Sequence, residues 1–97
     1  MPQLLLRRCR FFSARDEDQF FAWLKAIPGV VRVIGRADGL LVSLRSKRPS
    51  QETLRELLAL HFRYRLPMRQ LAQFETRQNM TWFRSREAYW YAKVFAK

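Results

Sequence analysis

The sequence predicts one α+β domain, with an antiparallel sheet covered by helices on one face and a short helix near the C-terminus. Three observations favour this class. The chain has 97 residues, which is enough for one core and too few for two, and 48% of them are hydrophobic, as is usual for a globular protein. A hairpin pattern lies between two stretches of helical periodicity. A serine suited to capping precedes each of those stretches.

The chain begins with a predicted strand over residues 3–12, a short apolar stretch that ends in paired aromatics. We expect Leu5, Cys9 and Phe11 to face the helices. A shift of one residue would reverse every facing, because side chains alternate along a strand.

A helix is predicted next, with Ser13 as its cap and Asp16 three residues later. The acidic residues that follow suit the positive end of a helix dipole. Apolar residues then recur at helical spacing, namely Phe20, Phe21, Leu24 and Ile27. The pair Pro28-Gly29 ends this helix.

Residues 30–34 and 40–44 are predicted to form a β-hairpin. Both runs are rich in aliphatic residues, and Gly35, Asp38 and Gly39 between them favour a turn. The alternation within each run indicates an antiparallel pair covered on one face.

A second helix is predicted after Ser50 and before Pro67. Its inner stripe consists of Leu54, Leu57, Leu58 and His61. Residues 68–75 fit either a strand or a helical turn. We predict a strand, because a sheet under two helices needs a fourth member. Ser85 is then expected to cap a short amphipathic C-terminal helix.

The resulting order of elements is βαββαβ, the split arrangement of ferredoxin-like folds. We therefore expect a single domain over residues 1–97. Residues 1–78 would form the ferredoxin-like core, and the aromatic and basic segment 79–97 would dock on it. That segment is also suited to lie on an anionic membrane or in a partner's groove. Closure of the core is the favoured of these interpretations.

One stretch resembles known families. Residues 26–44 read AIPGVVRVIGRADGLLVSL, which resembles the helix end and hairpin of ligand-sensing ACT domains and of the effector half of Lrp/AsnC regulators. The resemblance covers about a fifth of the chain and implies a ferredoxin-like domain that dimerises through its sheet. The last residues depart from those families and resemble small uncharacterised bacterial proteins.

Charge is the main indication of function. Nineteen Lys and Arg residues against eight Asp and Glu give a net charge of +11, which favours a polyanionic partner such as nucleic acid. A solvated basic surface without a dedicated ligand explains the charge equally well. The predicted nucleic-acid or anion-binding residues lie on the open sheet face or near its margins: Arg8, Arg10, Arg45, Arg63, Arg65, Arg69, Trp82, Arg84 and Arg86.

The same open face supports an alternative, a dimeric small-ligand or protein-interaction module. Leu4, Leu6 and Leu41 would be exposed there, more apolar area than a monomer usually leaves in water. A second copy packed on the sheet would bury these residues.

Of the classes of function considered, the sequence supports catalysis least. Cys9 is the only cysteine, which excludes an internal disulfide and a Cys-rich zinc site. It forms a conceivable dyad with His61, but both are better explained as packing. Glu52 and Glu56 lie one helical turn apart, and a charged solvent face explains them better than a metal site. We expect no enzyme activity, no cofactor and no metal. With no signal peptide or membrane span in the pattern, we expect a cytoplasmic protein.

Overall fold

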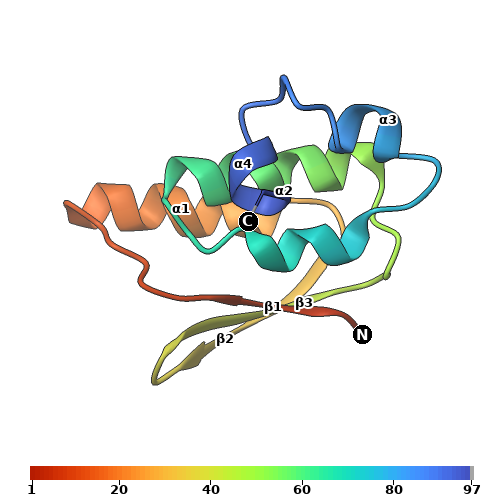
Figure 1. Ribbon diagram of the computed structural model, residues 1–97. Coiled ribbons are helices and arrows are strands. Elements are labelled where there is room, and N and C mark those ends of the chain that lie inside the picture. Colours follow the sequence, from red (N-terminus) through yellow and green to blue (C-terminus); the bar gives the residue numbers. More distant parts are fainter. Residues whose placement is uncertain (97) are drawn as a thin grey trace.

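In the computed structural model, which describes residues 1–96, the chain forms an α+β fold with helices over one face of a three-stranded antiparallel sheet (Figure 1). The elements are β1 (Gln3–Leu6), α1 (Ala14–Ala26), β2 (Val30–Arg36), β3 (Gly39–Leu44), α2 (Gln51–Arg63), the 3₁₀ helix η1 (Arg69–Phe74), α3 (Met80–Phe83) and α4 (Tyr91–Val94). In this described part, no helix is long and apolar enough to cross a bilayer.

The two long helices and the hairpin confirm the sequence prediction. Ser13 caps α1 by accepting a hydrogen bond from the Asp16 N–H at 3.1 Å. Ser50 caps α2 in the same way, accepting from the Thr53 N–H at 3.1 Å. Each serine satisfies a backbone donor that the first helical turn leaves unpaired. Each cap therefore fixes the residue at which its helix begins.

The sheet has the strand order β1-β3-β2, and its inner face is set by the register of β1 on β3. Leu4 pairs with Val42 and Leu6 with Leu40, so these residues share a face. Leu4, Leu6 and Val42 are at most 1% exposed. The predicted facing of β1 is therefore wrong, because Leu4 and Leu6 point into the core and Leu5 points away from it.

The error has a local cause. The prediction derived the phase of the first strand partly from Cys9 and Phe11, but β1 ends at Leu6. Arg8 then adopts a left-handed conformation with φ of 59°, which breaks the alternation of side chains. Cys9 and Phe11 still pack against the core, but from an irregular segment.

The predicted strand over residues 68–75 is also wrong, since Arg69–Phe74 form the 3₁₀ helix η1. This helix lies beside the edge of β1, and the Gln70 side chain contacts the backbone there. Its Oε1 accepts from the Leu5 N–H at 2.9 Å, and its Nε2 donates to the Leu5 carbonyl at 3.0 Å. One side-chain amide thus satisfies the edge groups that a further strand would have paired.

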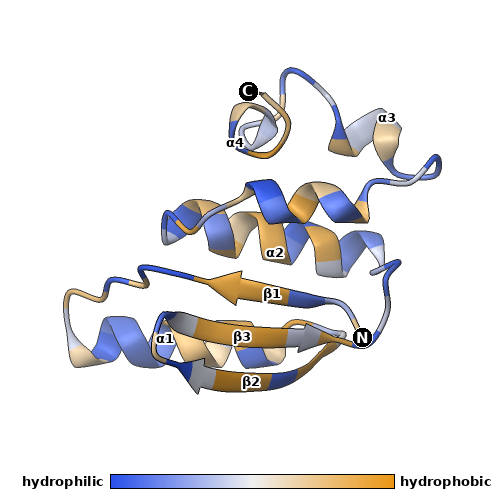
Figure 2. Ribbon diagram, turned by 60° about the horizontal axis from the view of Figure 1, so that its bottom comes forward, coloured by the Kyte–Doolittle hydropathy of each residue, from blue (hydrophilic) through white to orange (hydrophobic). Residues whose placement is uncertain are grey.

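The outer face of the sheet lacks a covering layer among residues 1–96, and Figure 2 shows the molecule from this side. Leu5, Leu41 and Ile34 lie opposite one another across the three strands and are half-buried. We call these three residues the apolar row. Of the predicted dimer face, only Leu41 lies here, because Leu4 and Leu6 belong to the core.

The C-terminal segment closes the core on the side of α2 that faces away from the sheet (Figure 2). Phe83, Trp90 and Val94 are buried in the main hydrophobic cluster. The Trp90 Nε1–H donates to the Phe83 carbonyl at 2.7 Å, so the indole nitrogen is paired inside the core. The regular helix α4 starts at Tyr91, later than the predicted cap at Ser85. Terminal aromatics therefore supply core area to this small domain.

Candidate anion-binding site

Four arginines from two distant segments meet at one end of the molecule. Arg8 and Arg10 follow β1, while Arg63 and Arg65 lie at the C-terminal end of α2. Together with Phe12, Asp16 and Tyr64 they line a cavity of about 510 Å³. We call this cavity the arginine pocket. All four arginines are exposed, and all four belong to the set that the sequence predicted for anion binding.

The end of α2 explains how Arg63 and Arg65 reach the pocket. The Leu66 N–H donates to the His61 carbonyl at 2.9 Å and the Arg65 N–H to the Phe62 carbonyl at 3.3 Å. These two bonds form a Schellman motif, in which the residue after the C-cap takes a left-handed conformation. Glycine usually occupies that position, but here it is Arg65, with φ of 56°.

A second left-handed residue, Arg8, also lines the pocket. Arg8 has φ of 59°, a conformation that costs a residue other than glycine about 1 kcal/mol. Arg8 and Arg65 are the two non-glycine residues with positive φ within residues 1–96. Backbone strain that persists in a fold is concentrated at functional sites. Both strained residues line the arginine pocket.

Charge in the arginine pocket is unbalanced. Asp16 is the only carboxylate among the lining residues, and its Oδ2 accepts the Phe12 N–H at 2.9 Å. Over residues 1–96 the one ion pair joins Arg84 to Glu75, so none of the four pocket arginines is paired. Four positive charges at one cavity raise the local electrostatic potential, which favours binding of an anion there.

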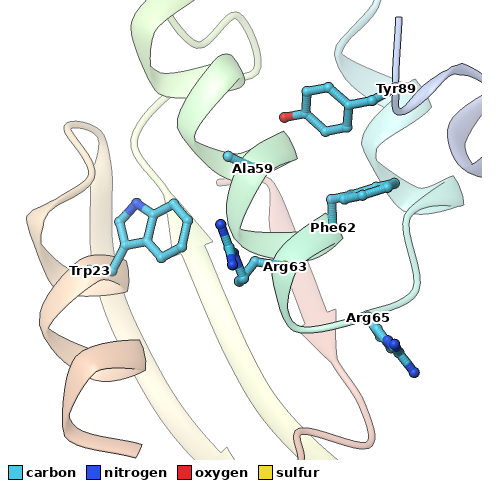
Figure 3. Close-up of a pocket in the computed structure, with 6 residues that line it drawn as sticks. All are labelled: Trp23, Ala59, Phe62, Arg63, Arg65 and Tyr89. Atoms are coloured by element: carbon cyan, nitrogen blue, oxygen red, sulfur yellow. The ribbon is translucent and has the colours of Figure 1, made fainter. Parts of the chain in front are cut away.

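A second cavity of about 510 Å³ adjoins the arginine pocket (Figure 3). It shares Arg63 and Arg65 with that pocket, and its other lining residues are Trp23, Ala59, Phe62 and Tyr89. We call it the aromatic groove. Trp23 comes from α1, Phe62 from α2, and Tyr89 from the segment before α4. The sequence prediction missed all three aromatics as site residues.

Two further predicted site residues are engaged elsewhere. Arg84 forms a bidentate pair with Glu75 at 2.6 and 2.8 Å and lies 4.3 Å over the Phe95 ring. This pair lowers the pKa of Glu75. The Arg69 guanidinium donates to the Ala96 carbonyl. Both arginines hold the C-terminal segment in place.

The remaining three predicted residues lie apart from the arginine pocket. Trp82 packs under the Arg55 guanidinium, which sits 4.3 Å from the ring centroid. Arg45 is exposed beyond the end of β3 and lines a small cavity with Arg48. Arg86 is exposed between α3 and α4. The structure thus unites four of the nine predicted residues and separates the other five.

Cys9 and His61 each bond to their own segment. The Cys9 thiol donates to the Leu6 carbonyl at 3.5 Å, and burial raises its pKa. His61 Nδ1 donates to the Leu57 carbonyl at 2.7 Å, which leaves Nε2 buried without a partner. Burial lowers the pKa of His61 to about 4. Within residues 1–96, no group of three or more His, Cys, Asp and Glu side chains is arranged to hold a metal ion.

Comparison with known proteins gives no family for this chain. No protein-family model matches it, and no significant similarity was found to a curated protein or to a solved structure.

Proposed function

We propose that the protein is a non-enzymatic nucleic-acid-binding module that holds backbone phosphates in the arginine pocket. The observation that carries this proposal is the convergence of Arg8, Arg10, Arg63 and Arg65 on one cavity with a single carboxylate. A guanidinium offers a planar fork that matches two phosphate oxygens. Several such forks at one cavity suit successive phosphates along a polyanion.

The backbone supports the same proposal. A glycine at the position of Arg8 or Arg65 would relieve the left-handed strain. An arginine at each position instead costs stability and adds a guanidinium to the pocket. Such a cost is expected where a side chain serves a ligand.

Titration of a labelled oligonucleotide at several salt concentrations tests the proposal. Each phosphate contact on a single strand contributes a slope of about −0.7 to the logarithm of affinity against the logarithm of salt. Four contacts therefore predict a slope of about −3. Absence of binding at low salt would contradict the proposal.

The apolar row favours a second candidate, a dimeric small-ligand or protein-interaction module. Leu5, Leu41 and Ile34 form a line across the uncovered sheet face, where a second copy would bury them. In this proposal the domain is ferredoxin-like and similar in shape to ACT and Lrp/AsnC effector domains, with η1 in place of the fourth strand. Sedimentation that shows a monomer at high protein concentration would contradict it.

A further inference from the structure

The aromatic groove indicates which kind of nucleic acid the protein binds. We infer, as an extension of the proposed function, that the ligand is single-stranded, with its phosphates in the arginine pocket and unpaired bases stacked in the aromatic groove. The two cavities share Arg63 and Arg65, so a strand can pass from one to the other without leaving the protein surface. Basic grooves beside aromatic rings are the usual means of binding single strands.

Phe62 and Tyr89 form one wall of the aromatic groove. Their ring centroids lie 4.8 Å apart at an interplanar angle of 74°, an edge-to-face contact. Phe62 is 39% exposed and Tyr89 is 50% exposed. Each ring is thus held by the other while part of its surface remains open to a stacking base.

Trp23 forms the opposite wall. Its Nε1–H donates to Glu56 Oε1 at 2.8 Å, which fixes the orientation of the indole. Ala59 also lines the groove, and its small side chain adds little bulk there. Figure 3 shows the Arg63 side chain between the Trp23 and Phe62 rings, and a guanidinium can itself stack on a base.

A further exposed aromatic lines the arginine pocket itself. Phe12 is 86% exposed and lines that pocket together with Arg8 and Arg10. Both cavities therefore combine exposed rings with guanidiniums. An unpaired strand carries bases and phosphates side by side, so its bases can stack on the rings while its phosphates bind the arginines.

A duplex does not fit this arrangement, because its base faces are already stacked inside the helix. An anionic membrane fits it less well, since membranes bind aromatics that project from the apolar face of a helix. The three aromatics of the groove instead line a recess beside charged side chains.

Three labelled ligands of one length test the inference at one salt concentration: a single strand, its duplex, and an abasic strand with the same phosphates. We expect the duplex and the abasic strand to bind at least about fivefold more weakly, because each stacked base is worth about fivefold or more. Phosphate contacts alone would make the duplex, with its higher charge density, bind at least as tightly.

The possible results of this experiment distinguish recognition of single strands from binding of phosphates alone. Equal or tighter binding of the duplex and the abasic strand would overturn single-strand recognition and leave phosphate binding intact. Failure of all three ligands to bind at low salt would overturn both. Binding to phosphatidylserine vesicles with none to the oligonucleotides would also overturn both, in favour of a membrane.

A matched pair of variants locates the stacking site. Tyr89→Leu should weaken binding of the single strand by about fivefold or more and leave binding of the abasic strand unchanged. Tyr91→Leu is the control, because Tyr91 packs against Phe95 and does not line the aromatic groove. Phe62→Leu and Phe62→Trp add a second comparison. Only Phe62→Trp should retain the affinity for the single strand, because it keeps an aromatic ring at this position. Equal effects of Tyr89→Leu and Tyr91→Leu would contradict the assignment.

Discussion

The side-chain amide of Gln70 forms with Leu5 both hydrogen bonds that a neighbouring strand would form. Oε1 accepts the Leu5 N–H and Nε2 donates to the Leu5 carbonyl, at 2.9 and 3.0 Å. Because these backbone groups point away from β3, Leu5 and Leu41 are a non-hydrogen-bonded pair, whose side chains approach closely. The edge of β1 is thus satisfied at Leu5 by a 3₁₀ helix.

Gln70→Ala should lower the free energy of unfolding by about 1–2 kcal/mol. The substitution removes both hydrogen bonds to Leu5 and leaves the partly buried N–H and carbonyl of Leu5 unpaired. Gln78→Ala is the control, since Gln78 is exposed and its loss should change stability by less than about 0.5 kcal/mol. Chemical denaturation measures both. Equal stability of the two variants would mean that Gln70 does not close the edge.

Gly39→Ala should destabilise the protein strongly. Gly39 has φ of 148°, and an added Cβ would lie 2.3 Å from the Leu6 carbonyl oxygen of the neighbouring strand. We expect a loss of at least about 2 kcal/mol, because both the backbone and the strand spacing must change. Gly35→Ala provides the comparison, since a Cβ there meets nothing within 4 Å. Thermal unfolding of the pair should show a large loss only for Gly39→Ala.

His61 should make the fold sensitive to acid. Its pKa is about 4 in the folded protein, against an ordinary value of 6.5. The unfolded chain therefore binds the proton first, and stability falls as the pH drops from 6.5 to 4, by up to about 3 kcal/mol. The ion pair of Glu75 also weakens in acid, because the pKa of Glu75 is lowered in the folded state.

Comparison of pH profiles of stability separates these two contributions. His61→Leu should flatten the fall between pH 6.5 and 4, and Glu75→Gln should alter only the part below its ordinary pKa of 4.5. Urea unfolding at each pH provides the profile. A His61→Leu protein with the full loss of stability would show that His61 is not the acid-sensitive group.

Arg65→Gly should weaken binding of an oligonucleotide without lowering the stability of the fold. Glycine adopts the left-handed conformation of the Schellman motif without strain, so stability should stay the same or rise by up to about 1 kcal/mol. Binding of an oligonucleotide should weaken, because one guanidinium of the arginine pocket is lost. Melting and binding are measured on the same preparation. A loss of stability would contradict the strain argument.

Local signals predicted much of the fold. Ser13 and Ser50 cap the two long helices, and the glycines between the aliphatic runs mark the hairpin. Each of these features depends on residues only a few positions apart. The facing of β1 depended on where the strand ends, which the left-handed Arg8 decides. The identity of η1 depended on the Gln70 side chain, whose contact with Leu5 bridges distant parts of the chain.

The candidate site was predicted only in part, because it also depends on contacts between distant parts of the chain. Arg8, Arg10, Arg63 and Arg65 were expected to bind an anion from their charge, but nothing in the sequence grouped them apart from Arg84 or Arg69. That grouping arises where the segment after β1 meets the end of α2. Trp23 and Tyr89 were missed because they become neighbours of Phe62 only in the folded chain. The alternation of aromatics and arginines over residues 62–65 was the one local signal.

Binding of phosphates in the arginine pocket is best tested by the salt dependence of oligonucleotide binding in the variant Arg10→Ala/Arg63→Ala. Its control is Arg36→Ala/Arg77→Ala, which removes the same charge from exposed positions outside the arginine pocket. We expect the pocket variant to lose about 1.4 from the slope, equivalent to two phosphate contacts, and the control to retain nearly the full slope. Equal slopes for the two variants would show that the arginine pocket does not hold the phosphates.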